Sequence, residues 1–273
     1  MGLTETNVIL SDIRQNSEKL MPLYSICITC RNNVETARES IESILSQIDD
    51  NFEVIVVDAK SADGTTEILR EYAEKGRIKL IVKKCTRGLG RQIAFENSQG
   101  KYIIANMDLD DVFAPKLKDL LEFYHKHCEG KLLLTIKGLS KGIKGEQNVT
   151  IGTRQVIEKL GGWRDLQWGE DWDLWRNAAK INLFNYTIFP LVERSCTHFE
   201  RQHLISKIMF RYIMYRDMMR LGRDVFQPYE KKSLLQRIVL LVATVGALLK
   251  ERSATNFSNS FDPYNRKHEI DFS

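Results

Sequence analysis

The sequence predicts an α/β fold in which a mixed, mainly parallel, Rossmann-like sheet is flanked by helices and followed by a C-terminal helical extension. Three observations support this prediction. Short β-branched runs alternate with amphipathic stretches between residues 24 and 107, as in successive β-α-β units. The chain has 273 residues, of which 43% are hydrophobic and 28% charged, so it can bury one large core. Beyond residue 200 the pattern becomes helical and basic.

Four apolar runs in the first half are expected to form strands. They cover Tyr24–Ile28, Phe52–Val57, Ile78–Val82 and Lys101–Met107. Between them, apolar residues recur at spacings of three and four over residues 34–48, which predicts a helix with Asn32 or Asn33 as its cap. Asp63 is expected to cap the second helix, and the third helix is expected to begin near Gly90.

The second half is expected to complete the sheet. Residues 132–136 and 184–189 have strand composition, and the later run is the expected last strand. Pro115 can open a helix at its first turn. Thr153 can cap a short helix, which Gly161 and the glycine after it end in the left-handed conformation.

Two segments lack a packing pattern, and they set the domain division. Residues 137–148 are rich in lysine and glycine, which indicates a basic loop. The last residues are polar, with little to pack. We therefore divide the chain into a lead-in (1–21), one α/β domain (22–200), a basic amphipathic helical extension (201–250) and a polar tail (251–273).

Composition limits the environment and the partners. A net charge of +4 suits anionic phosphates or lipid headgroups and does not call for nucleic acid. Five scattered cysteines disfavour a disulfide framework and favour a reducing, cytoplasmic compartment. Cys27 and Cys30 lie three apart in an expected strand, so they should point to opposite faces as buried thiols. No export signal is indicated, and the apolar run at 238–249 is shorter than the roughly 20 residues that cross a bilayer.

Acidic residues gather where the fourth strand ends, at Asp108, Asp110 and Asp111. Ligands of open α/β sheets collect outside the carboxyl ends of the strands. Magnesium and manganese prefer oxygen ligands, few of them from protein when a phosphate supplies the others. One aspartate at such a turn is usually a cap, but three within four positions favour a metal site.

Other polar residues have two interpretations each. Glu170 and Asp171 are expected at a helix start, where a carboxylate can take a proton or simply stabilise the helix by some tenths of a kcal/mol. Asp58 ends the second strand and can bind a ligand or cap a turn. Arg87 and Arg91 surround a glycine-rich turn and can face phosphates or form a solvated cluster.

Four segments, in this order, resemble the family 2 glycosyltransferases of the GT-A fold, and together they cover about residues 22–200. They are Ser25–Asn33, Val56–Thr65, Arg87–Asp111 and Gly161–Leu174. Each segment alone is a weak signal, but their order on the expected elements is specific. The resemblance implies a metal-dependent transfer of a hexose from a UDP- or GDP-linked donor to a hydroxyl of a glycan or lipid-linked acceptor. It also implies inversion by direct displacement.

The resemblance implies a role for each candidate residue. Asp171 is the implied catalytic base, with Glu170 beside it, and Trp168 and Trp172 are an acceptor platform or merely packing. Mn²⁺ or Mg²⁺ is implied at Asp108, Asp110, Asp111 and His198. The donor is implied to contact Thr29, Arg31, Asn32, Asp58, Arg87, Arg91 and Asp108.

The opening turn departs from the family pattern, which puts base recognition in question. The family usually has a proline and an aromatic residue where this chain has Thr29 and Arg31. A second acid common after the second strand is Ala59 here. Arg31 can stack on the base in place of the aromatic ring, so uridine and guanosine nucleotides both stay open.

The extension has apolar residues on one helical face with basic residues beside them, from 204 to 223. This pattern suits peripheral docking on an anionic membrane at its cytoplasmic face. Packing against the domain or against a second subunit of a homo-oligomer explains the same residues about as well.

Two other functions remain alternatives. A nucleotidyltransferase would be expected to have a glycine-rich, arginine-bearing loop after the first strand, but residues 29–33 contain no glycine. A non-catalytic scaffold could keep the fold and bind a partner or membrane. The intact acids at 108, 110, 111 and 171 argue against the scaffold.

Overall fold

The computed structural model describes most of the expected α/β domain and parts of the extension. The described residues are 21–136, 147–195, 204–220, 235, 238–240, 242–243 and 266–271. His198 and Cys196, and residues 137–146 of the expected basic loop, lie outside them.

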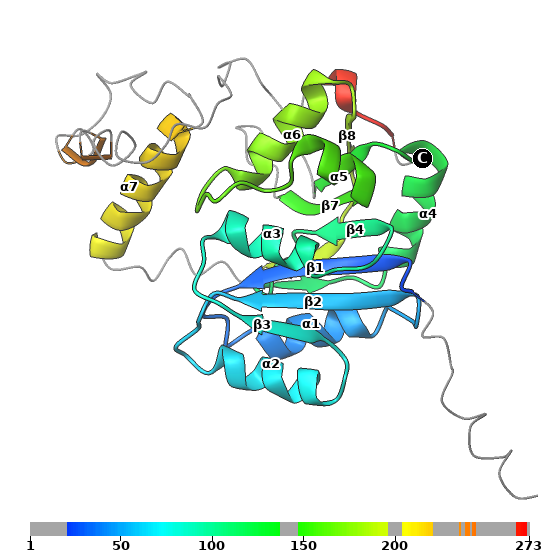
Figure 1. Ribbon diagram of the computed structural model, residues 1–273, viewed down its shortest axis with the longest axis horizontal. Helices are drawn as coiled ribbons and strands as arrows, with labels where there is room; N and C mark the ends of the chain where they lie inside the picture. Colours follow the sequence, from blue (N-terminus) through cyan, green and yellow to red (C-terminus); the bar gives the residue numbers. More distant parts are fainter. Residues whose placement is uncertain are drawn as a thin grey trace, which may run out of the picture.

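A seven-stranded sheet forms the centre of the molecule, in the order β3-β2-β1-β4-β7-β6-β8 (Figure 1). Its strands are β1 (Tyr24–Cys30), β2 (Phe52–Asp58), β3 (Lys79–Val82), β4 (Tyr102–Ala105), β6 (Leu132–Ile136), β7 (Gln147–Thr153) and β8 (Phe184–Ile188). Strand β1 is parallel to β2 and β4, β2 is parallel to β3, and β6 is parallel to β8. Only β7 among them runs antiparallel, between β4 and β6. The prediction of a mixed, mainly parallel sheet is confirmed.

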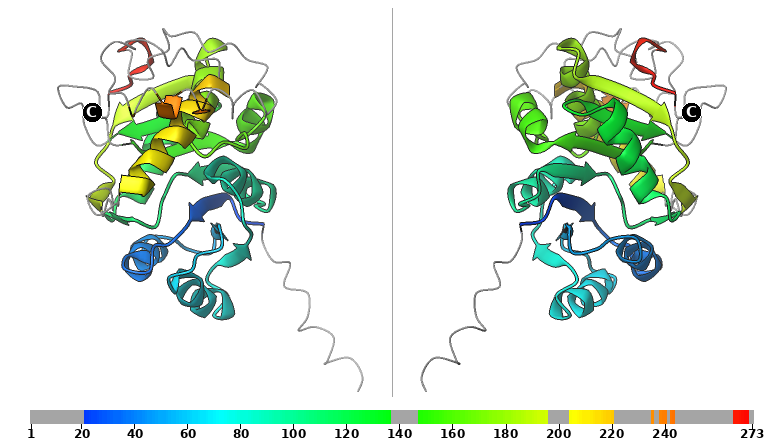
Figure 2. Two further views of the ribbon diagram at one scale, coloured as in Figure 1. Left: turned by 90° about the vertical axis from the view of Figure 1, so that its left-hand side faces the viewer. Right: turned by 90° about the vertical axis from the view of Figure 1, so that its right-hand side faces the viewer.

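Helices cover both faces of this sheet (Figure 2). They are α1 (Ala37–Leu45), α2 (Thr65–Glu74), α3 (Arg87–Glu96), α4 (Leu117–His127), α5 (Arg154–Leu160) and α6 (Glu170–Lys180). Apolar residues of α1, α2 and α4 form one core with one face of the strands, and residues of α3, α5 and α6 form a second core with the other face. The sheet therefore fixes α3 and α6 on the same side, which matters for the site.

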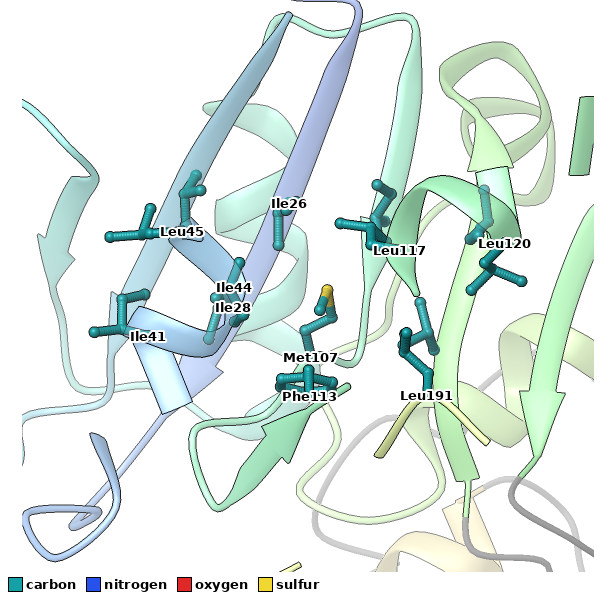
Figure 3. Close-up of a cluster of buried hydrophobic side chains, with 14 of the residues drawn as sticks. Ile26, Ile28, Ile41, Ile44, Leu45, Met107, Phe113, Leu117, Leu120 and Leu191 are labelled. Carbon is teal, nitrogen blue, oxygen red and sulfur yellow. The ribbon is translucent and has the colours of Figure 1, made fainter. Parts of the chain in front are cut away.

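Part of the first core lies between β1 and α1 (Figure 3). Ile26 and Ile28 of β1 face Ile41 and Ile44 of α1, and all four side chains are fully buried. Each such side chain contributes about 1.5–3 kcal/mol by leaving water. The core continues under the acidic turn through Met107, so the turn rests on a packed layer.

Cys27 and Cys30 point to opposite faces of β1, as predicted. Cys27 belongs to the core shared with α3, and Cys30 to the core shared with α1. Burial raises the pKa of the Cys27 thiol to about 12, and burial also raises the pKa of Cys30 well above its usual value. Both are inert buried thiols, not a redox pair.

The cap of α1 was predicted at the wrong residue. The helix follows Thr36, not Asn32 or Asn33. The two asparagines are used in the turn instead, since Asn33 Oδ1 accepts the Arg31 N–H at 3.1 Å and Asn32 Oδ1 accepts the Ala62 N–H at 3.0 Å. The Asn32 side chain thus holds the loop after β1 against the loop after β2, and the Asn33 side chain closes the turn within the first loop.

Two other helix starts and one helix end can be compared with their predictions. α3 begins three residues before the expected Gly90, because the Thr86 hydroxyl accepts the Leu89 N–H at 3.2 Å and forms the N-cap. Thr153 caps α5 as predicted, accepting the Val156 N–H at 3.2 Å. Gly161 then ends α5 with a φ of +82°.

The starts of α2 and α4 are shifted by one or two positions. α2 follows Gly64, although the carboxylate of Asp63 still accepts the Thr65 N–H at 3.1 Å. α4 begins two residues after Pro115, so the proline lies in the approach to the helix and not in its first turn. In both cases the expected residue still shapes the helix start.

Two strands contradict the predicted sequence of elements. β7 includes residues 147 and 148, which we assigned to a loop. The last strand is not at 184–189, because β9 (Val192–Ser195) follows and pairs with β5 (Asp111–Phe113) in a second, two-stranded sheet. β5 begins at an acidic residue of the candidate metal site, so β9 holds that turn from outside the main sheet.

The extension contains α7 (Leu204–Arg220) and shorter pieces. Tyr215 of α7 packs with Val239, Leu240 and Ala243 in a small separate core. No helix among the described residues is long and apolar enough to cross a membrane. Membrane docking and a homo-oligomer stay predictions.

Residues 266–271, within the expected polar tail, pack against the domain, contrary to expectation. The turn η3 (Arg266–His268) lies beside β8, and the His268 side chain is 7% exposed. The Ile270 N–H donates to the carbonyl of Tyr186 at 2.8 Å. The polar composition of residues 266–271 did not indicate this packing, because backbone groups of His268 and Ile270 make hydrogen bonds to the domain.

Candidate active site

Arg91 of α3 lies at the centre of the candidate site. Its side chain is 2% exposed and faces carboxylates from two other segments. Nη1 lies 3.1 Å from Asp108 Oδ1, Nη2 lies 3.2 Å from Asp171 Oδ2, and Nε lies 3.5 Å from Glu170 Oε1. Because the guanidinium is planar and rigid, this arrangement holds the end of β4 and the start of α6 together.

Arg91 is buried among carboxylates and does not belong to a solvated cluster of basic residues. Burial alone would lower the pKa of Arg91, but the charges of Asp108, Asp171 and Glu170 outweigh burial and raise the pKa. Arg91 was predicted to face phosphates or solvent. Instead it neutralises protein carboxylates in a buried position, and this role was missed.

Two glycines allow α3 to approach its neighbours closely. A Cβ atom on Gly88 would lie 2.0 Å from the carbonyl oxygen of Arg164, and a Cβ atom on Gly90 would lie 2.3 Å from Thr29 Oγ1. The Gly88 N–H also donates to the carbonyl of Leu166 at 2.8 Å. The glycine-rich segment, which we expected to be a turn beside phosphates, is therefore a helix start that permits close packing.

Asp171 uses both carboxylate oxygens within the site. Oδ1 accepts a hydrogen bond from Trp163 Nε1 at 2.8 Å, and Oδ2 pairs with Arg91. Asp171 is 6% exposed and Trp163 is 3% exposed. Two buried donors therefore fix the orientation of this carboxylate. Trp163 was not assigned this role, although it directly follows the glycine pair that ends α5.

The other acid in the first turn of α6 has a structural role. Asp173 pairs with Arg176 at 2.7 Å and also with Arg164. The three acids Glu170, Asp171 and Asp173 all lie at the positive end of the helix dipole. Of these three, Asp173 faces cations of its own and lies outside the Arg91 network.

Glu170 has the most perturbed carboxyl group of the site. Burial, followed by the charge of Asp171, raises its pKa to about 8, although Arg87 and Arg91 oppose the shift. At neutral pH a large share of this carboxyl is protonated, so it can donate a hydrogen bond. A buried carboxyl with a raised pKa is typical of functional sites.

This raised pKa predicts how stability depends on pH. Between about pH 4.5 and 8 the unfolded chain loses the Glu170 proton while the folded chain keeps it, so the contribution of Glu170 to stability falls as pH rises. Glu170→Gln removes this dependence. We expect the melting temperature of Glu170→Gln, relative to that of wild type, to rise between pH 5 and pH 9. Calorimetry in matched buffers measures this difference. A constant difference across this range would contradict the raised pKa.

The acidic turn after β4 is held from the α1 side. The Thr36 hydroxyl donates to the carbonyl of Leu109 at 2.7 Å, and Ser43 Oγ accepts the Phe113 N–H at 3.1 Å. The Asp111 N–H donates to the carbonyl of Asp108 at 3.1 Å, which closes the turn. The position of the three acids is therefore set by backbone contacts, leaving their side chains partly exposed.

The three acids suit a divalent cation by chemistry. Their ligands would all be carboxylate oxygens, the type that Mg²⁺ and Mn²⁺ prefer. Asp108 is already paired with Arg91. In the described residues no group of three or more His, Cys, Asp or Glu side chains could hold a metal ion alone. Such a sparse donor set fits a cation that takes further ligands from a diphosphate.

Some of the residues predicted to contact the donor, Asp58, Asn32 and Arg31, lie at or just after the ends of β1 and β2. Asp58 is fully buried and accepts hydrogen bonds from the Ser61 hydroxyl at 2.6 Å and from the Thr66 hydroxyl. This is the turn-cap alternative. The Asn32 N–H donates to Ser61 Oγ at 2.8 Å, and the Arg31 side chain is exposed. Their contacts with a nucleotide stay predictions.

Two predicted aromatic residues are brought together at the start of α6. The rings of Trp168 and Trp172 stack with centroids 6.5 Å apart at 26°. Both side chains are partly exposed, as an acceptor platform requires. Arg87 is half exposed and lies 3.9 Å from Glu170, at the border of the Arg91 network.

The fold and the site define a class of protein. A mainly parallel sheet flanked by helices carries an acidic turn at the carboxyl end of β4 and an acid pair at the start of α6, and Arg91 joins the two. Residues 25–170 match the family model described as glycosyl transferase family 2, and the chain belongs to this family. Of the functions considered from the sequence, family membership supports an enzyme that transfers glycosyl groups.

Curated relatives agree with this assignment. The chain is 39% identical to EpsE of Bacillus subtilis, named as a glycosyltransferase, over 111 residues that cover 39% of this chain and 40% of EpsE. It is 32% identical to TuaG of the same organism, a glycosyltransferase named for teichuronic acid biosynthesis, over 37% of this chain and 42% of TuaG. The chain thus spans less than half the length of these two relatives.

Solved structures share the fold. The fragment TarS 1–349 of S. aureus, in complex with UDP-GlcNAc, superposes with a TM-score of 0.53 at 18% identity, covering 86% of this chain and 74% of that one. The mannosyltransferase PcManGT of Pyrobaculum calidifontis, in complex with GDP-Man and Mn²⁺, has the same TM-score at 19% identity, covering 84% of this chain and 74% of that one. These likenesses establish the GT-A architecture.

Proposed function

We propose that this chain transfers a hexose from a UDP- or GDP-linked donor to a hydroxyl group of a glycan or lipid-linked acceptor. The proposal rests mainly on the Arg91 network, in which one cation contacts both Asp108 of the acidic turn and Asp171 of α6. Groups suited to the donor and to the acceptor thus lie side by side. The two structural neighbours hold a UDP-linked and a GDP-linked sugar. TuaG is named for polymer biosynthesis, which supports a polysaccharide or glycoconjugate acceptor.

In the proposed reaction Asp171 takes the proton of the acceptor hydroxyl. The acceptor oxygen forms a bond to the anomeric carbon while the bond from that carbon to the diphosphate breaks, which inverts the configuration. Trp163 and Arg91 keep the Asp171 carboxylate in one orientation. Trp168 and Trp172 would carry the acceptor ring on their exposed faces.

Mn²⁺ or Mg²⁺ would be held by Asp110 and Asp111 together with Asp108, and it would neutralise charge on the departing diphosphate. His198, the further ligand that the resemblance implies, lies outside the described residues. The Arg91 pair already stabilises Asp108, so Asp110 is the more direct test of metal binding. Both Asp110 and Asp111 are partly exposed, which gives a ligand access to them.

Asp110→Asn is expected to abolish the manganese-dependent part of nucleotide binding while the fold stays intact, because it removes one ligand charge from a partly exposed site. Calorimetric titration of UDP and GDP with and without Mn²⁺ measures this. Asp119→Asn, on the exposed side of α4, is the control. Unchanged affinity for the metal–nucleotide complex would remove Asp110 from the set of ligands.

The donor itself is tested by a thermal-shift screen of nucleotide-diphosphate sugars with and without Mn²⁺. Ligands that bind the native state raise its free energy of unfolding by mass action, by about 2.7 kcal/mol at a hundredfold excess over Kd, and the melting temperature rises with it. We expect one nucleotide class to stabilise the chain more than the other. No shift with any sugar nucleotide would contradict the proposed function.

A further inference from the structure

Asp217 is a buried carboxylate that the reaction described above does not use. It is the single acid of α7, whose other charged residues are all basic. Its side chain is 0% exposed. Oδ2 accepts the N–H groups of Gln167 at 2.9 Å and Trp168 at 3.2 Å, and Oδ1 accepts from Arg216 Nε at 2.8 Å. A buried carboxylate is stable only when it is paired and hydrogen-bonded, and these contacts meet both conditions.

The two backbone N–H groups that Asp217 accepts belong to the 163–169 loop, which lies between α5 and α6. The opposite side of this loop is held by the start of α3. The Thr86 hydroxyl contacts Asp165 Oδ1 at 2.6 Å, and the Arg87 N–H donates to Gln167 Oε1 at 3.2 Å. The loop is therefore fixed between two helices far apart in the sequence.

The 163–169 loop contains or precedes the groups assigned to the acceptor side. Trp163, the hydrogen-bond donor to Asp171, is its first residue, and Glu170 and Asp171 follow its last. Gly169 has a φ of +77°, so the chain changes direction just before the acid pair. A displacement of the loop would move both the carboxylate and its orienting donor.

Figure 1 shows α7 on the side of the sheet to which the arrows of β1 and β2 point. The carboxyl ends of parallel strands are where ligands of such sheets bind. α7 thus lies beside the candidate site and contacts it through a specific buried charge. The same helix was expected, from its basic and apolar pattern, to dock on a membrane or to pack on the domain, and this contact is of the second kind.

We propose that Asp217 is a positioning residue for glycosyl transfer. By accepting two backbone N–H groups of the 163–169 loop, it sets where α6 begins and so places Asp171 relative to Arg91. α7 is then part of the catalytic unit. The positioning role rests on the proposed function, whereas the hydrogen bonds by which Asp217 holds the loop do not depend on it.

Hydrogen exchange of the full chain tests this hold directly, because it follows the N–H groups that Asp217 accepts. In Asp217→Ala we expect the peptide with Gln167 and Trp168 to exchange at least about tenfold faster, since hydrogen bonds to a charged acceptor are lost. Protection of β1 should stay unchanged. Asp217→Asn keeps an acceptor oxygen and should show a smaller increase. Met209→Ala, at a half-exposed position of α7, is the control and should match wild type.

Transfer kinetics test the positioning role with the same variants. We expect the turnover number of Asp217→Ala to fall at least about tenfold while the Kd of UDP or GDP with Mn²⁺ stays within about twofold. Asp217→Asn should recover part of the turnover. A general loss of structure would change both quantities and the protection of β1.

The outcomes are distinct. Unchanged loop exchange in Asp217→Ala and Asp217→Asn would overturn the inference. If Asp217→Ala fails to fold, Asp217→Asn decides in the same way. Faster loop exchange with wild-type turnover would overturn the positioning role. If wild type transfers sugar from no donor, the proposed function fails and the positioning role fails with it, but the exchange result still decides whether Asp217 holds the loop.

Discussion

Asp171→Asn is expected to transfer sugar about a hundredfold to ten-thousandfold more slowly than wild type, because an amide cannot take the acceptor proton. The loss should appear in kcat, with the Kd of the donor nearly unchanged. The structure adds a smaller effect on stability. Asp171 accepts from Trp163 and pairs with Arg91, whereas an asparagine has a single acceptor oxygen for these two donors. Nucleotide release with the donor found by the thermal-shift screen, together with donor titration, measures both quantities.

Trp163→Phe is the matched control for this prediction. It removes the hydrogen bond to Asp171 but leaves the carboxylate and its pair with Arg91. A hydrogen bond to a charged group contributes about 1.5–3 kcal/mol, so turnover should fall by roughly tenfold to a hundredfold at most. Equal losses in the two variants would mean that orientation, not proton transfer, is the function of Asp171. Full activity of Asp171→Asn would move the role of base to Glu170.

Arg91→Met is expected to destabilise the fold by about 3–5 kcal/mol, the usual result of removing one partner from a buried ion pair. Methionine has a comparable length but leaves Asp108, Glu170 and Asp171 without their shared cation. At roughly 2–4 °C per kcal/mol for a domain of about 200 residues, the melting temperature should fall by roughly 10 °C. Denaturant titration and thermal unfolding both measure this loss.

Arg87→Met serves as its control, since Arg87 is one turn away on the same helix but half exposed. An exposed pair at 3.9 Å contributes at most about 1 kcal/mol, so the stability of this variant should stay close to that of wild type. If Arg91→Met and Arg87→Met lose the same amount, the buried network is not what stabilises the site.

Most of the sheet could be predicted from the sequence because β-branched runs identify buried parallel strands without reference to their partners. The boundaries could not. Asn32, Asn33 and Thr36 are all good cap residues, and the choice among them depends on contacts across the fold. The helix follows Thr36, whose hydroxyl donates to the carbonyl of Leu109 in a distant part of the chain. β7 was missed because the lysine and glycine before it conceal where the strand begins.

The candidate site was predictable in its acids and not in its contacts. Asp108 and Asp171 are 63 positions apart (171 − 108 = 63), and their common partner Arg91 is known only once α3 and α6 share a face. Arg91 was expected to face phosphates or to form a solvated cluster because it lies beside a glycine-rich segment. Asp217 had a signal in the sequence, as one acid in a basic and apolar helix. Nothing in that pattern indicates which backbone groups it accepts.

The packing of the tail beside β8 has a consequence for how the molecules behave in concentrated solution. β8 is the outermost strand of the sheet, and such a strand offers N–H and C=O groups to which a second chain can add. Here the protein covers part of that border itself, because Glu269 bridges to Tyr186 and Ile270 donates to it. The opposite border, β3, has four residues and begins with a lysine. One border is occupied and the other is short and charged, so both resist strand-to-strand aggregation between neighbouring molecules.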